Sequence, residues 1–146
     1  RHRLDADESF LPDVLLLNCG LHDIRRDPKS DALQVAIDQY EQNLREIKRL
    51  VVSNGIRLAW VTTTPVNDER HRQHEQAFIR RNQDVLDYNA VAEIVFADDT
   101  IIDLYTFTRR LGTNGMTLYG DHVHFVDAIC QLQAAYVCGA LNNQFT

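Results

Sequence analysis

The sequence predicts an α/β domain in which helices cover both faces of a parallel sheet. Three short apolar runs have the composition of buried strands, and amphipathic helical segments alternate with them along the chain. Strands and helices in this order are joined by right-handed crossovers, which place successive strands parallel in one sheet. The predicted architecture is therefore a three-layer α/β/α sandwich of the flavodoxin-like type.

The first strand is expected at Asp13–Asn18, an apolar run that ends just before the turn at Gly20. An unbroken run of this kind is typical of a strand buried on both faces. After a polar loop, either Ser30 or Asp31 is expected to cap a helix that extends to about Ser53. Apolar residues recur within this helix at spacings of three and four, which predicts one buried stripe.

The second half of the chain repeats the pattern. Ile56–Thr63 is the second expected strand, and a helical region follows over Asp68–Ala97 with a break near Asn82. Thr100–Leu104 is the third expected strand, and a glycine-rich loop comes after it. Val126–Leu141 is expected to form the closing helix.

Composition sets limits on the class of protein. The chain has 146 residues, 45% of them hydrophobic and 25% charged, which suits one globular domain. Its net charge of -6 argues against a nucleic-acid partner, since phosphate contacts require an excess of Lys and Arg. It contains no apolar run long enough to span a membrane, and the polar start at 1–9 is not a signal peptide. We expect a soluble protein without a membrane partner, and the sequence does not fix its compartment.

The three cysteines lack the spacing of a metal or redox motif. We expect Cys19, Cys130 and Cys138 to be buried free thiols. Cys130 and Cys138 are eight residues apart, which places them on one face of the closing helix and favours core packing. Trp60, in the middle of the second strand, is also predicted to lie in the core.

One group of polar residues follows the first strand. Gly20 permits a tight turn there, and His22 and Asp23 are expected to project into the crevice beyond the strand. Open α/β sheets bind their ligands outside the carboxyl ends of the strands. The alternative is a polar loop in which Asp23 caps backbone amides.

A second group, Asp121-His122-Val123-His124-Phe125, precedes the closing helix. An aspartate three residues before a histidine on a turn can reach the imidazole Nδ1–H. This contact fixes the tautomer and leaves Nε2 available as a base. The alternative is a pair of solvated histidines near a helix start.

Together, in this order and at these strand ends, the two groups resemble the SGNH/GDSL hydrolase family. The segment Pro12–Asp23 is similar to the family's third conserved block, "PDVxxxxxGxND", and Asp121–His124 to the "DxxH" of its fifth. Val61–Val66 and Ile101–Tyr105 look like the intervening strands. The resemblance spans nearly the whole chain.

The resemblance implies a serine ester hydrolase that needs no cofactor and no metal. His124 would be the general base and Asp121 its orienting acid. Gly20 and His22 would lie at the oxyanion hole, with Asp23 beside them at the substrate. The implied substrate is a small ester, such as an acetylated carbohydrate or a lipid-like alcohol.

The family's first block, Gly-Asp-Ser, has no counterpart in this chain. Ser9, Ser30 and Ser53 are the three serines, and none of them follows a strand and opens a helix. We therefore expect residues 1–146 to be a single domain that is incomplete at its N-terminus and inactive alone. A companion segment or chain would supply the serine. The strand at Asp13–Asn18 would otherwise present an unpaired edge, so we expect folding only with that companion or with a second copy.

The histidine at position 22 is a further departure, because the family usually has asparagine there. A neutral imidazole can still donate one ring N–H to an oxyanion. Two other functions stay open. One is a metal site formed by His22, Asp23, Asp121, His122 and His124. The other is a non-catalytic domain of the same fold that binds carbohydrate.

Two further segments have two interpretations each. Arg70–His74 is expected to be a solvated helix face, with the binding of an anionic substrate as the alternative. Tyr119, beside Gly120, either lines the substrate cleft or packs in the core.

Overall fold

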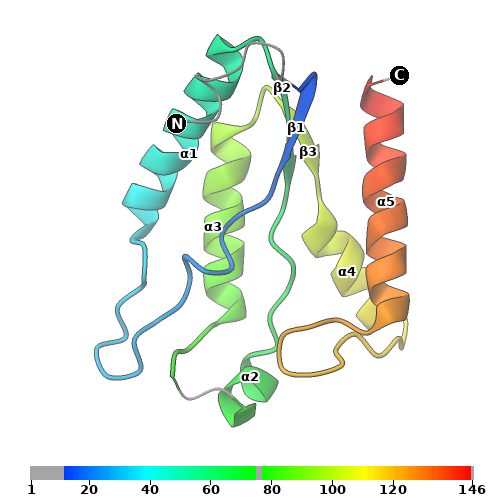
Figure 1. Cartoon of the computed structure of the whole chain (residues 1–146). Coiled ribbons are helices and arrows are strands. Elements are labelled where there is room, and N and C mark those ends of the chain that lie inside the picture. Colours follow the sequence, from blue (N-terminus) through cyan, green and yellow to red (C-terminus); the bar gives the residue numbers. More distant parts are fainter. Residues whose placement is uncertain (1–11, 75–76, 146) are drawn as a thin grey trace.

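The computed structural model describes residues 12–74 and 77–145 (Figure 1). Its elements, in chain order, are β1 (Val14–Leu17), α1 (Ile37–Ser53), β2 (Arg57–Val61), α2 (Asp68–His74), α3 (Asn82–Val95), β3 (Thr100–Ile102), α4 (Leu104–Thr113) and α5 (Asp127–Phe145). The strands form one parallel sheet in the order β1-β2-β3. The predicted order of strands and helices is confirmed, except that α4 was not predicted.

The helices lie on both faces of the sheet. Helices α1 and α3 pack together on one face, and α4 and α5 pack together on the other (Figure 1). The three-layer α/β/α architecture predicted from the sequence is therefore confirmed.

The strand register brings the functional loops to one end of the molecule. Leu17 pairs with Trp60, and Val61 pairs with Ile102, so the three strands end close together. The loops that follow β1 and β2, and the loop that leads into α5, all lie at this end, which is the lower end in Figure 1. The parallel topology thus collects side chains from distant parts of the sequence at one edge of the sheet.

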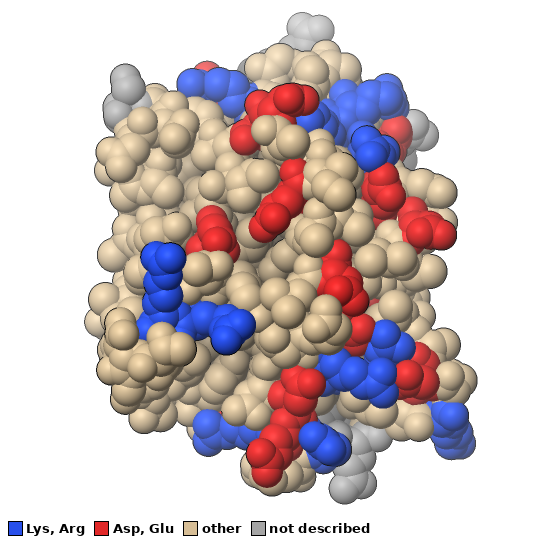
Figure 2. All heavy atoms as spheres, turned by 180° about the vertical axis from the view of Figure 1, so that it is seen from behind, with Lys and Arg blue, Asp and Glu red and all other residues tan. Residues whose placement is uncertain are grey.

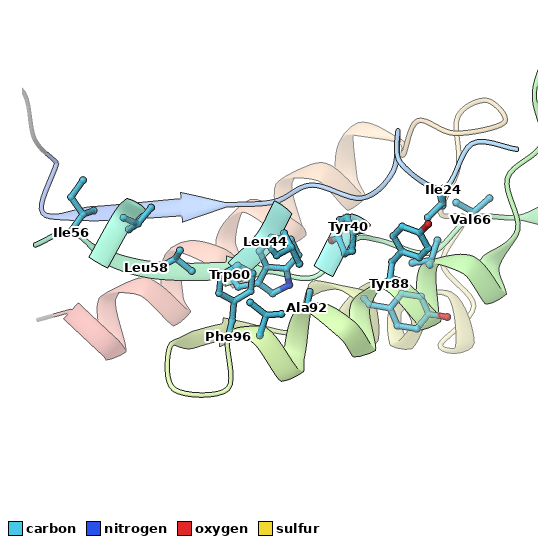
Figure 3. Close-up of a cluster of buried hydrophobic side chains, with 14 residues drawn as sticks. Ile24, Tyr40, Leu44, Ile56, Leu58, Trp60, Val66, Tyr88, Ala92 and Phe96 are labelled. Atoms are coloured by element: carbon cyan, nitrogen blue, oxygen red, sulfur yellow. The ribbon is translucent and has the colours of Figure 1, made fainter. Parts of the chain in front are cut away.

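The core lies between the sheet and the α1–α3 layer (Figure 3). Trp60 is fully buried, as predicted, and stacks on Phe96 with ring centroids 4.9 Å apart. Tyr40 of α1 and Tyr88 of α3 form a second ring pair at 4.7 Å. The first pair joins β2 to the residue that follows α3, and the second joins α1 to α3, so together they hold the layer in place.

Strand β1 is an edge strand among the described residues, where its one partner is β2. Its predicted burial on both faces is wrong for the chain as described, because Leu16 is 44% exposed. The apolar run correctly indicated a strand, but burial depends on what lies beyond the sheet edge, and sequence periodicity does not report this.

Two helix boundaries differ from the prediction. The first helix begins at Ile37, not near Asp31, whose φ of 58° is outside the helical region. The glycine-rich segment after β3 contains a helix, α4, that the sequence analysis missed. Asp103 caps α4 by accepting a hydrogen bond from Thr106 N at 2.9 Å, so β3 ends at Ile102, before the predicted end at Leu104. The predicted break near Asn82 is confirmed, because α3 begins there.

Burial of the last two cysteines was predicted wrongly. Cys130 and Cys138 are exposed on α5, and Cys19 is partly buried. Ile129 is the fully buried residue of α5. Eight-residue spacing correctly placed the two thiols on one helix, but it did not show which side of that helix faces the sheet.

Charged side chains are distributed over the surface. On the face opposite to that of Figure 1, Lys and Arg are interspersed with Asp and Glu (Figure 2). Exposed ion pairs within α1 join Arg45 to Glu41 at 2.6 Å and Arg49 to Glu46 at 2.8 Å. Such pairs contribute little to stability, because water screens them. None of the helices described is both long and apolar enough to cross a membrane.

Candidate active site

A short loop before α5 brings Asp121 and His124 into contact. Asp121 Oδ2 lies 2.7 Å from His124 Nδ1. Asp121 Oδ1 accepts hydrogen bonds from the backbone N–H groups of Val123 and His124, both at 2.7 Å. One carboxylate therefore both shapes the turn and orients the imidazole.

These contacts keep the Asp121 carboxyl group ionised. The N–H groups of His124 and Val123, together with the His124 ring, hold the pKa of Asp121 well below its usual range. An ionised Asp121 favours the tautomer that carries its proton on Nδ1. His124 Nε2 then keeps its lone pair, and it has no hydrogen-bond partner within residues 12–74 and 77–145. The His124 side chain is 81% exposed, so Nε2 is accessible for proton transfer.

The loop that carries this pair is tied to the end of β2. Tyr119 and Phe125 stack at 5.0 Å, and Gly120 N donates to His124 O at 2.9 Å, which closes a small hairpin. Tyr119 Oη donates to the carbonyl of Pro65 at 2.8 Å. Tyr119 is 8% exposed, which supports its packing role. The buried Tyr119 thus anchors the hairpin that carries the exposed His124.

The turn after β1 contains the other candidate residues. Gly20 is buried and has a φ of +135°, which residues with a side chain rarely adopt. Its carbonyl accepts a hydrogen bond from Ile24 N at 3.0 Å, so residues 20–24 form a compact turn. Ile24 is fully buried and anchors the turn in the core (Figure 3).

His22 and Asp23 lie on this turn. His22 is exposed, and Asp23 is partly exposed. The Asp23 side chain makes no hydrogen bond to the described residues, so its predicted alternative role as a cap is wrong. Gly20, His22 and Asp23 are therefore together on one turn, and Asp121 and His124 are together on the hairpin. No hydrogen bond or ion pair joins the two groups within the described parts of the chain.

The metal-site alternative is not supported. Among residues 12–74 and 77–145, no three or more His, Cys, Asp or Glu residues are grouped so that they could hold a metal ion. His122 instead packs on aromatic neighbours in α2, with its ring centroid 5.5 Å from that of His71 and 6.2 Å from that of His74.

The prediction of a solvated Arg70–His74 face is wrong in two places. His71 is 1% exposed. The Arg70 guanidinium donates to the carbonyl of Tyr119 at 3.2 Å, so it supports the hairpin.

The two serines that the structure describes are remote from this chemistry. Ser30 Oγ donates to Asp27 Oδ1 at 3.1 Å, and Ser53 Oγ donates to Leu50 O at 3.0 Å. Ser9 lies outside the described residues. The described residues thus contain an oriented histidine without a serine beside it.

Three residues that the sequence did not predict support the turn. Tyr40 and Thr63 both donate to the carbonyl of Cys19, at 3.1 and 3.0 Å. Asn89 bonds both backbone polar groups of Thr63, at 2.8 and 2.9 Å. The run of threonines before Pro65 was one available signal, because hydroxyl groups at a strand end often satisfy backbone carbonyls.

The fold is that of the SGNH/GDSL-type hydrolases, and the candidate residues lie at the carboxyl ends of its strands. A lipase/acylhydrolase from Enterococcus faecalis is similar, with a TM-score of 0.69 and 19% sequence identity. A putative GDSL-like lipase from Parabacteroides merdae gives a TM-score of 0.71 at 14% identity, and the acetyl xylan esterase AlAXEase gives 0.68 at 19%. The TM-scores establish a shared fold, and at these low sequence identities the likeness concerns the fold alone.

The overlap covers most of this chain but less of its neighbours. The alignments include 91% of this chain and 63% of the Enterococcus protein, 97% and 66% for the Parabacteroides protein, and 89% and 67% for AlAXEase. The chain therefore spans about two thirds of the length of these structures. Searches of family models and of curated proteins found no match to the sequence.

Proposed function

We propose that this chain carries the acid–base half of a serine ester hydrolase, with the nucleophilic serine supplied by a segment outside it. The observation that carries the proposal is the Asp121–His124 contact with Nε2 left accessible. The neighbouring folds support it, because the similar proteins are lipases and esterases.

The proposed reaction uses each residue in a defined role. His124 Nε2 takes the proton of the serine hydroxyl as its oxygen attacks the ester carbonyl. Asp121 stabilises the resulting imidazolium without taking its proton. The N–H groups of the Gly20 turn, with His22 beside them, donate to the developing oxyanion. His124 then returns the proton to the leaving alcohol, and water releases the acyl group by the same steps.

The proposed substrate is a small acyl ester, with an acetylated carbohydrate as the first class to test. One of the similar structures is an acetyl xylan esterase, which motivates this choice. A lipid-like alcohol is the second class. The proposed catalysis needs no cofactor.

The test begins with the coding sequence and with the purified protein. Intact mass and tryptic mapping would show whether a segment that carries Gly-Asp-Ser belongs to the same protein or co-purifies with it. Hydrolysis of p-nitrophenyl acetate is then measured for a serine-to-alanine variant in that segment and for His124→Gln. Both are expected to lose activity by on the order of 10³-fold or more.

His122→Gln is the matched control, since His122 is on the same hairpin but is not bonded to Asp121. The proposal expects this variant to keep its activity. Equal losses in the two histidine variants, restored by added metal, would favour the metal site. Absence of any serine segment would refute the esterase and favour the carbohydrate-binding domain.

A further inference from the structure

The carbonyl oxygen of Cys19 accepts two side-chain hydrogen bonds at the end of β1. Tyr40 Oη lies 3.1 Å from it, and Thr63 Oγ1 lies 3.0 Å from it. Tyr40 belongs to α1 and Thr63 follows β2, so donors from two elements meet on one peptide group. Since a carbonyl oxygen has two lone pairs, these donors occupy both.

Thr63 is itself held in a fixed position. Asn89 Oδ1 accepts from Thr63 N at 2.8 Å, and Asn89 Nδ2 donates to Thr63 O at 2.9 Å. Thr63 is 4% exposed and Asn89 is 5% exposed, so water does not compete for these bonds. Asn89 of α3 therefore fixes the backbone of Thr63, and this backbone sets the direction of the Thr63 hydroxyl.

The other side of the same peptide group is the N–H of Gly20. In a trans peptide the N–H points opposite to the carbonyl, and the structure has no cis bonds among its described residues. The Cys19 carbonyl points to α1 and the end of β2, so the Gly20 N–H points away from them, to the open side of β1. Gly20 is buried, and its N–H donates to none of the described residues. An N–H of a buried residue without a partner is rare in proteins, so its acceptor is expected to come from outside the described residues.

We infer that Tyr40 and Thr63 are positioning residues for an oxyanion donor, the N–H of Gly20. Their hydroxyl groups fix the plane of the Cys19–Gly20 peptide, so that the N–H is already aimed before the ester arrives. They also polarise this peptide, because donors on its oxygen strengthen its N–H as a donor. The inference rests on the proposed esterase function and adds two residues that do not touch the substrate.

The kinetic test uses Tyr40→Phe and Thr63→Val in the full-length protein. Each variant removes one hydroxyl with little change of shape. Removal of an oxyanion donor lowers kcat by about 10² to 10³. Since loss of one hydroxyl only loosens such a donor, we expect a loss of about tenfold in kcat, with KM for p-nitrophenyl acetate unchanged. Thr63→Ser keeps the hydroxyl and should restore most of kcat.

Tyr88→Phe is the matched control. Tyr88 pairs with Tyr40 in the core (Figure 3). Its hydroxyl also donates to a backbone carbonyl, that of Val35. This variant should lose comparable stability and keep the wild-type kcat. An unchanged kcat in Tyr40→Phe and Thr63→Val, or an equal loss in Tyr88→Phe, would overturn the inference.

A second readout does not depend on catalysis. The chain has two Cys–Gly peptide bonds, Cys19–Gly20 and Cys138–Gly139. Labelling with ¹³C′-Cys and ¹⁵N-Gly selects the amide resonances of Gly20 and Gly139. Tyr40→Phe and Thr63→Val should shift the Gly20 resonance and leave that of Gly139, which lies in α5.

The two readouts separate the two claims. An inactive wild-type protein would refute the proposed esterase function and, with it, the catalytic part of the inference. A Gly20 resonance that does not move in either variant would overturn the inference even in an active enzyme. A shifted resonance together with a reduced kcat would support both claims.

Discussion

Replacement of Gly20 by alanine should destabilise the protein through two separate effects. The φ of +135° is strained for any residue with a side chain. The new methyl carbon would also lie 2.7 Å from Thr63 Oγ1, closer than two such atoms can pack. Thr63 cannot move freely, because its backbone N–H and its carbonyl are both hydrogen-bonded to the Asn89 side chain.

The magnitude follows from these contacts. Holding alanine at a sparsely populated φ costs about 1–3 kcal/mol. Displacing the Thr63 hydroxyl from the Cys19 carbonyl loses one hydrogen bond, worth about 1 kcal/mol. We expect Gly20→Ala to lower the free energy of unfolding by about 2–4 kcal/mol, from the sum of these two costs.

Two other glycines supply internal controls for the urea unfolding of the full-length protein. Gly55 has a φ of +71° with no neighbouring atom within 4 Å of the added methyl, so alanine there should cost about 1 kcal/mol. Gly139 lies within α5 and is also open, so alanine there should stabilise by about 0.5–1 kcal/mol. If Gly20→Ala cost no more than Gly55→Ala, the close approach to Thr63 would be refuted. In a Thr63→Ala background, the additional cost of Gly20→Ala should fall by about 1 kcal/mol.

Three further predictions concern charge and titration. Asp84→Ala should lower the free energy of unfolding by about 3 kcal/mol in urea titration. The substitution removes two 2.7 Å hydrogen bonds and leaves the charge of the partly buried Arg26 without this partner. A loss below about 0.5 kcal/mol would contradict this prediction. Burial raises the pKa of Cys19 to about 11, so its labelling by iodoacetamide should accelerate only as pH approaches that value; rapid labelling at pH 8 would be inconsistent with a buried thiol. The lowered pKa of Asp121 stabilises the fold above the ordinary carboxyl value of 3.8, and this contribution is lost at lower pH. The urea midpoints of wild type and Asp121→Asn should therefore differ most at pH 6, and the gap should narrow progressively as pH falls below 3.8 toward the lowered pKa of the folded state. A gap that is constant with pH would show that the carboxylate is not held as described.

The elements that the sequence predicted correctly are those with a local signal. The three strands appeared as apolar runs, and α1 appeared as a stripe of apolar residues at spacings of three and four. The break near Asn82 was also predicted from the sequence. Helix α4 was missed because glycines in and after its last turn dominated the pattern, although Asp103 offered a capping signal before Leu104.

Burial was less predictable than secondary structure. Trp60 was placed correctly, since β2 is the central strand and helices cover both faces of the sheet, so its side chains are buried whichever face they point to. Cys130, Cys138 and Leu16 were not, because each lies on an element with one covered side, and the side is decided by the elements that pack there. His71 is the opposite case, a polar residue that tertiary packing buries against Phe78 and His122.

The sequence by itself determined the Asp121–His124 contact, because a carboxylate can reach an imidazole three residues later within one turn. Only the tertiary structure decided the surroundings of the Cys19 carbonyl. Its two donors, Tyr40 and Thr63, are 21 and 44 residues away, and no local pattern fixes which strand end meets which helix. That meeting depends on the parallel register and on the packing of α1 against the sheet, which are properties of the whole fold.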